Sequence, residues 1–109
     1  MPTIEETFDT LKNGFIAEKA AGTDAVIQWE INGDGGGIWH VAIKDSTCII
    51  NRGPAPNPNV TLQLSVQDWL DMHAGKKTRQ MLFMTGKLKL KGEMGLAMKL
   101  GSLFQPPKG

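Results

Sequence analysis

The chain has 109 residues, of which 40% are hydrophobic, 6% are aromatic and 21% are charged. A chain of this length buries about two-thirds of the surface that its unfolded form exposes, so we expect a single domain over residues 1–109. The composition excludes disorder, and the sequence shows neither a secretory signal nor an apolar run long enough to span a membrane. The one cysteine, Cys48, excludes an internal disulfide, and no metal-ligand spacing is present, so we expect no metal and no cofactor.

The net charge of +1 conceals two regions of opposite sign. Residues 1–71 carry ten acidic and four basic side chains, whereas residues 72–109 carry eight basic side chains and one acidic side chain. Such a basic region either contacts phosphate groups, of an anionic membrane or a phosphorylated ligand, or is an ordinary solvated face. The candidate phosphate or membrane contacts are Lys76, Lys77, Lys87, Lys89 and Lys91.

The first predicted element is a helix with Thr3 as its N-cap and Glu6 completing a capping box. Its apolar residues recur at helical spacing, at Ile4, Phe8, Leu11 and Phe15. We expect this helix to continue to about Ala20 and to end at Gly22.

The middle of the chain changes to the period of two that is typical of strands. A glycine-rich turn over residues 32–37 and a proline-rich loop over residues 52–59 separate some of the segments. Short connections make the first three strands an antiparallel meander. The predicted strands are Ala25–Ile31, Ile38–Lys44, Thr47–Asn51 and Val60–Ser65.

Helical periodicity returns after Ser65, which is a second N-cap. We expect a helix that Gly75 ends, a shorter helix from Thr78 to Gly86, an amphipathic strand over Lys87–Lys91, a last helix over Glu93–Phe104 and a tail over residues 105–109. The resulting order of elements indicates an α+β domain without internal repeats.

The last predicted helix has more apolar surface than a helix resting on a sheet requires. On a helical wheel its apolar side chains cover an arc of about 220°, against the roughly 100° that contact with one layer needs. Five of the six methionines lie within residues 72–98, and methionine suits irregular or changing apolar surroundings. These methionines are either fillers of a small core or the lining of a cavity for an apolar guest, and we favour the cavity.

The residues also resemble a known family. The segment Gly86–Leu100, which reads GKLKLKGEMGLAMKL, closely resembles the signature of the sterol carrier protein type-2 (SCP2-like) family, and Met72–Lys76 resembles another family segment. The resemblance covers nearly the whole chain. It implies a five-stranded sheet covered by helices, with an internal apolar tunnel that binds fatty acids, fatty acyl-CoA, sterols or phospholipids without catalysis. Some relatives carry glutamine where Met98 stands, which suggests a drier tunnel here.

We therefore expect a non-catalytic lipid carrier that acts in the cytoplasm, because peroxisomal relatives end in a targeting signal that residues 107–109 do not match. The expected tunnel residues come from every predicted helix and from the sheet: Leu11, Phe15, Trp29, Trp69, Met72, Met81, Met84, Leu88, Leu90, Met94, Met98, Leu100, Leu103 and Phe104.

Other functions find less support in the sequence. No nucleophile, metalloprotease or paired-carboxylate motif is present, and we interpret His40 as structural and Cys48 as a core residue, so we expect no enzymatic activity. The basic region lacks interleaved aromatic residues, which argues against a nucleic-acid partner. The alternative is a docking module whose apolar last helix binds a partner subunit or enzyme without lipid. The sequence leaves open a monomer or a weak homodimer.

Overall fold

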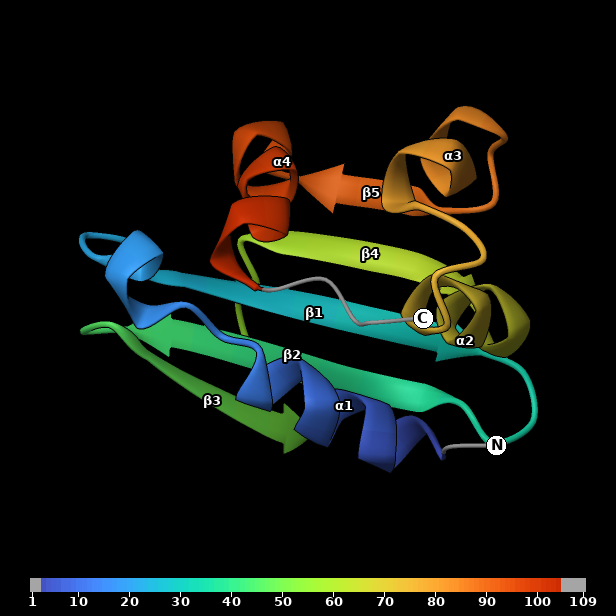
Figure 1. Cartoon of the computed structure of the whole chain (residues 1–109), viewed down its shortest axis with the longest axis horizontal. Helices are drawn as coiled ribbons and strands as arrows, with labels where there is room; N and C mark the ends of the chain where they lie inside the picture. Colours follow the sequence, from blue (N-terminus) through green and yellow to red (C-terminus); the bar gives the residue numbers. More distant parts are fainter. Residues whose placement is uncertain (1–2, 105–109) are drawn as a thin grey trace.

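The computed structural model describes residues 3–104, without the side chains of residues 100 and 101, so the predicted tail lies outside the described part. The elements follow the predicted order (Figure 1). They are α1 (Ile4–Asn13), the short 3₁₀ helix η1 (Ala17–Ala20), β1 (Ala25–Asn32), β2 (Gly37–Lys44), β3 (Thr47–Arg52), β4 (Val60–Ser65), α2 (Val66–His73), α3 (Arg79–Met84), β5 (Lys89–Gly92) and α4 (Met94–Leu103).

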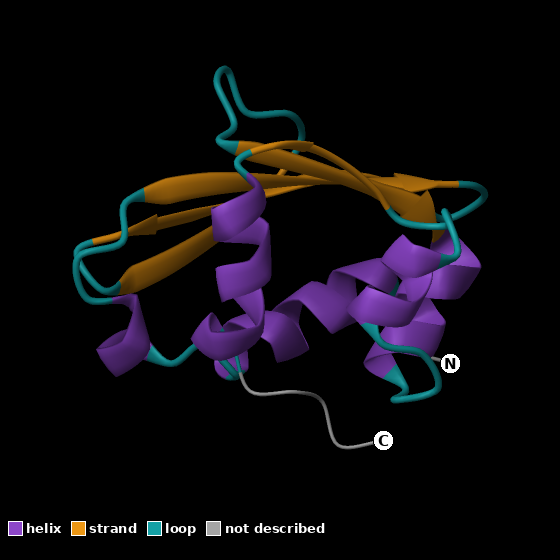
Figure 2. Ribbon diagram, turned by 90° about the horizontal axis from the view of Figure 1, so that it is seen from above, coloured by secondary structure: helices purple, strands orange, loops and turns teal. Residues whose placement is uncertain are grey.

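The five strands form one mixed sheet in the order β3-β2-β1-β4-β5. The first three strands form the predicted antiparallel meander, β4 lies parallel to β1, and β5 pairs antiparallel with β4 at the sheet edge. Figure 2 shows the helices on one side of this sheet, while the other side is left without a helix. The expected α+β fold with a five-stranded sheet is therefore confirmed.

The prediction of one helix from Thr3 to about Ala20 is wrong in its second half. The capping box of Thr3 and Glu6 is present, but α1 ends at Asn13 and a separate 3₁₀ helix follows. Phe15 instead forms an isolated β-bridge with Phe104, next to a hydrogen bond from the Ile16 amide to the Leu103 carbonyl. Tertiary pairing with the end of the chain thus overrides the helical spacing of the apolar residues. The other predicted boundaries agree with the structure to within two residues.

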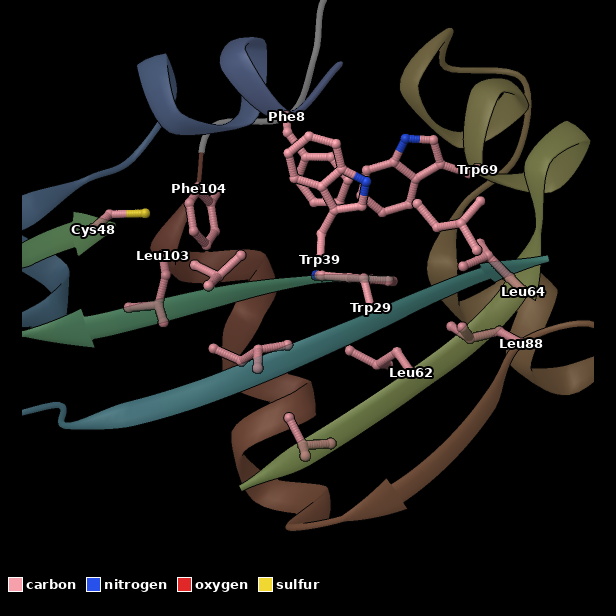
Figure 3. Close-up of a cluster of buried hydrophobic side chains, with 14 of the residues drawn as sticks. Phe8, Trp29, Trp39, Cys48, Leu62, Leu64, Trp69, Leu88, Leu103 and Phe104 are labelled. Atoms are coloured by element: carbon pink, nitrogen blue, oxygen red, sulfur yellow. The ribbon is translucent and has the colours of Figure 1, made fainter. Parts of the chain in front are cut away.

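Aromatic side chains fill the space between the sheet and the helices α1 and α2. The ring of Phe8 stacks between Trp39 and Trp69, with centroid distances of 4.6 and 4.7 Å, and Trp29 meets the edge of Trp69 at 4.8 Å (Figure 3). The Trp69 indole N–H donates to the Thr7 hydroxyl at 2.7 Å, so its polar atom is satisfied inside the core. This half of the helix-covered side is closely packed.

The opposite side of the sheet carries a hydrogen-bonded polar cluster, beside the exposed apolar side chains of Ile38 and Ile49. Glu30 accepts hydrogen bonds from the side-chain amides of Gln28 and Gln63. The backbone amide of Ala55, in the loop between β3 and β4, donates to the side-chain oxygen of Gln28. The two hydrogen bonds to its carboxylate lower the pKa of Glu30, and the bond from Gln63 has the larger effect. The alternation of the strands therefore separates a solvated face from the apolar face under the helices.

Gly92 fixes the turn from β5 into α4. Its φ is +109°, and a Cβ at this position would lie 2.3 Å from the Asn59 carbonyl oxygen. The next amide, of Glu93, donates to that same carbonyl at 3.0 Å. Because only glycine permits this approach, the chain leaves β5 close against β4 and places α4 over the edge of the sheet.

Candidate functional site: an apolar pocket

A pocket of about 470 Å³ opens between α3, β5 and α4. Figure 1 shows these two helices near opposite ends of β5. Seven of the nine lining residues are apolar, and the volume lies within the roughly 300–1,000 Å³ of typical small-molecule pockets. The lining residues are Leu62, Arg79, Gln80, Phe83, Leu88, Leu90, Met94, Ala97 and Met98.

The floor of the pocket comes from the edge of the sheet. Leu88 and Leu90 alternate with the exposed Lys89 along the last strand and its approach, so their side chains lie on the helix-covered face. Leu62 is the register partner of Leu90 on β4 and extends this floor toward the middle of the sheet. Figure 3 shows Leu62 and Leu88 on the same side of the sheet as the core tryptophan Trp29.

One wall comes from a single face of α4. Met94, Ala97 and Met98 have the spacing that brings side chains to one face of a helix. Both methionines are largely exposed, Met94 at 52% and Met98 at 80%, so flexible thioether side chains form the rim of the pocket. Leu96 and Leu103 of the same helix pack against the core instead. These apolar residues of α4 thus have two different roles, contact with the core and lining of the pocket.

The other wall is α3, which Thr78 caps by accepting a hydrogen bond from the Met81 amide. This short helix brings Arg79, Gln80 and Phe83 to the pocket. Arg79 is half-buried, and loss of hydration lowers the pKa of its guanidinium below the ordinary value. The pocket is therefore an apolar hollow with a polar end on α3.

Four of the predicted tunnel residues line this pocket, namely Leu88, Leu90, Met94 and Met98. The others are elsewhere. Trp29, Trp69, Leu103 and Phe104 are buried in the core, and Leu11, Phe15 and Met72 pack against it. Met81 and Met84 are exposed on α3 and do not line the pocket, and the side chain of Leu100 lies outside the described part. In this structure the aromatic cluster fills the half under α1 and α2, and the pocket lies in the other half, between α3, β5 and α4.

The sequence prediction missed five lining residues: Leu62, Arg79, Gln80, Phe83 and Ala97. Two of these had a readable signal. Leu62 alternates on β4 with the other inward-facing residues, and Ala97 stands three positions after Met94 on a predicted helix. The residues of α3 had none, because six helical residues are too few to define a face by periodicity.

The predicted lysine contacts divide into two groups. Lys77 is already engaged, with its Nζ 3.0 Å from Asp68 Oδ1 and 3.3 Å from Asp71 Oδ2, and these two carboxylates raise its pKa. Lys76 lies exposed in the loop before α3, and Lys87, Lys89 and Lys91 are exposed along β5 and its approach. The exposed lysines stay candidates for phosphate or membrane contacts.

The surroundings of Cys48 and His40 are those of structural residues. Cys48 is buried, and desolvation raises the pKa of its thiol to about 11, so the reactive thiolate is disfavoured. The Nδ1 atom of His40 lies 2.8 Å from the Gly53 carbonyl oxygen.

Within residues 3–104 no group of three or more His, Cys, Asp or Glu side chains is placed to hold a metal ion. No helix in this same part of the chain is long and apolar enough to cross a membrane.

A mixed five-stranded sheet, helices on one face and an apolar pocket at the sheet edge are the features expected of a small lipid-binding or lipid-transfer domain. The chain matches the SCP-2 sterol transfer family over residues 7–105 and belongs to this family. The resemblance found in the sequence is therefore confirmed.

Individual relatives agree with this membership. The chain is 39% identical over 102 residues to hydroxysteroid dehydrogenase-like protein 2 of Bos taurus, a match that covers 93% of this chain and 24% of that protein. The chain thus spans about a fifth to a quarter of the length of the curated relatives it matches.

Solved structures show the same fold. Sterol carrier protein 2 of Yarrowia lipolytica, in its apo form, superimposes with a TM-score of 0.71 at 26% identity, covering 89% of this chain and 85% of that one. Palmitated SCP2L2 of Aedes aegypti superimposes with a TM-score of 0.80 at 23% identity, covering 99% of both chains.

Proposed function

We propose that this chain is a non-catalytic carrier of long-chain lipids, which it holds with their apolar part in the pocket between α3, β5 and α4. The candidate ligands are fatty acids, fatty acyl-CoA, sterols and phospholipids. The observation that carries this proposal is the pocket itself, since seven apolar side chains from β4, α3, β5 with its approach, and α4 converge on one hollow. Family membership supports the same function.

Burial of an apolar chain favours binding without a covalent bond. About sixteen methylenes transferred from water contribute roughly 13 kcal/mol at about 0.8 kcal/mol each. Association costs of about 4–15 kcal/mol offset much of this gain. A fluorescence titration measures the net affinity that remains. Non-covalent burial therefore suffices for a carrier, and the pocket lining offers no nucleophile for catalysis.

A docking role without lipid is the weaker proposal. It was motivated by the excess apolar surface of α4, part of which is assigned to the core contacts of Leu96 and Leu103 and to the pocket lining by Met94 and Met98. The longer relatives are named dehydrogenase-like. In a longer protein of that kind, we propose that this domain binds the lipid and leaves the reaction to another part of the chain.

A matched pair of methionine variants tests the proposal. Met98 lines the pocket and Met84 does not, although both are helical and similarly exposed, at 80% and 75%. We expect Met98→Glu to weaken binding of cis-parinaric acid about tenfold or more, because it places a carboxylate where an apolar chain lies. Met84→Glu adds the same charge and should leave the affinity unchanged.

The titration also measures the number of sites. Saturable binding near one lipid per chain that palmitoyl-CoA or oleate reverses supports the proposal. Equal effects of the two substitutions, or fluorescence that rises without saturation, would contradict a lipid site at this pocket.

A further inference from the structure

Arg79 is the charged side chain among the nine residues that line the pocket. It opens α3, half-buried, beside the apolar lining provided by Phe83 and Leu88. A guanidinium carries five N–H donors and is costly to remove from water unless an anion or other acceptors replace the lost hydration. The position of this side chain therefore calls for an explanation.

No acidic side chain within residues 3–104 supplies that anion. The ion pairs in this part of the structure are those of Lys77, which bonds both Asp68 and Asp71. Arg79, two positions further along the chain, forms no ion pair with any of these described residues, so its guanidinium is a candidate to bind a ligand's anionic group. Burial without a compensating charge also agrees with the lowered pKa of this guanidinium.

The neighbouring residue adds a second donor. Gln80 lines the same pocket, and its side-chain amide also carries N–H donors. Carboxylates and phosphates match such a fork with two parallel hydrogen bonds, which is why arginine recognises these groups better than lysine does. The other seven lining residues offer only apolar side chains to a ligand.

We propose that Arg79 binds the anionic head of a single-chain amphiphile whose tail fills the pocket. The carrier then selects lipids with a free carboxylate or phosphate over neutral lipids of the same chain length. This inference rests on the proposed lipid-carrier function and adds to it the class of ligand and the residue that reads the head group.

The experiment compares three ligands with the same tail: palmitate, hexadecanol and hexadecyl phosphate. Each displaces the neutral dye Nile red from the wild-type chain, from Arg79→Gln and Arg79→Lys, and from the control Arg52→Gln. Arg52 is the other arginine of the chain and lies exposed on β3, 5.7 Å from the Trp39 ring centroid. Nile red itself reports whether each variant still has an intact pocket.

We expect the wild-type chain to bind palmitate or hexadecyl phosphate about tenfold more tightly than hexadecanol, and Arg79→Gln to remove that preference while binding hexadecanol as before. The ratio between palmitate and hexadecyl phosphate identifies which head group is preferred. Arg79→Lys should retain part of the preference, because it keeps the charge and loses the fork. Arg52→Gln should retain all of it.

Several results would overturn the inference. Equal affinity of the wild-type chain for palmitate and hexadecanol would show that the head group is not read, whatever the fate of the variants. A loss of affinity in Arg79→Gln that is the same for hexadecanol as for palmitate would assign Arg79 a structural role. Failure of all three ligands and of Nile red to bind the wild-type chain would instead contradict the proposed carrier function itself.

Discussion

At the scale of single residues, the hydroxyl of Thr7 shows how the filled half of the molecule is stabilised. It accepts a hydrogen bond from the buried Trp69 indole and donates to the Ile4 carbonyl one turn earlier in α1. Thr7 is only 3% exposed and Trp69 is fully buried, so water replaces neither bond if the hydroxyl is removed. A buried donor that loses its acceptor costs about 1–3 kcal/mol.

The substitution Thr7→Val tests this contact, because valine keeps the shape of threonine and removes the hydroxyl. We expect the free energy of unfolding to fall by about 1–3 kcal/mol, measured by urea denaturation followed by circular dichroism. Thr10→Val is the control, since Thr10 is exposed on the same helix and its change should stay within about 0.5 kcal/mol. Equal losses in the two variants would show that the indole bond contributes nothing.

At the scale of elements, the junction of β5 and α4 sets the position of one pocket wall. Gly92 approaches the backbone of Asn59 so closely that a Cβ has no space, whereas Gly86, also at positive φ, has nothing within 4 Å of such an atom. Alanine substitutions at the two glycines therefore distinguish the cost of a strained backbone from the cost of a steric clash.

We expect Gly86→Ala to lower the free energy of unfolding by about 1–2 kcal/mol, the cost of a left-handed conformation for a residue with a Cβ. Gly92→Ala should cost clearly more, because the pairing of β5 with β4 must also shift to relieve the collision. Thermal and urea unfolding of both variants measure the difference. A Gly92→Ala variant that is as stable as Gly86→Ala would contradict the proposed close approach.

Element patterns also explain how far the sequence alone predicts the structure. Strict alternation over residues 87–91 was enough to predict that Leu88 and Leu90 face the helices, because a strand has only two faces. Helical spacing equally predicted that the last helix is apolar over most of its circumference. The same spacing failed at Phe15, because its β-bridge with Phe104 joins residues far apart in the sequence. The periodicity of apolar residues reports local structure and does not predict a contact between residues far apart in the sequence.

The candidate site was harder to predict than the fold. The methionine cluster indicated the right region, yet Met81 and Met84 face solvent while their neighbours Gln80 and Phe83 line the pocket. Which side of a six-residue helix faces a hollow depends on how the loop before it is anchored, here by the bonds of Lys77 to α2. Such anchoring is a tertiary property, and no pattern within α3 reports it.

At the scale of the whole molecule, the helix-covered side of the sheet has two unlike halves. Under α1 and α2 the aromatic rings of Phe8, Trp39 and Trp69 fill the space, and under α3 and α4 a hollow of about 470 Å³ remains. The filled half has a continuous buried core that holds the sheet together. The other half is bounded by the short elements α3 and β5 and by exposed methionines, so we expect it to adapt to a guest more readily than the filled half.

This division makes the methionine methyl groups direct reporters of where a lipid lies. Met94 and Met98 line the hollow, Met84 is exposed outside it, and Met72 packs against the filled half. The most direct measurement is a titration of the methyl-labelled chain with palmitate, followed by the NMR signals of these methyl groups. The account predicts saturable shifts at Met94 and Met98 with Met72 and Met84 nearly unchanged. Bound palmitate that leaves Met94 and Met98 unshifted, or that shifts Met72 and Met84 instead, would contradict it.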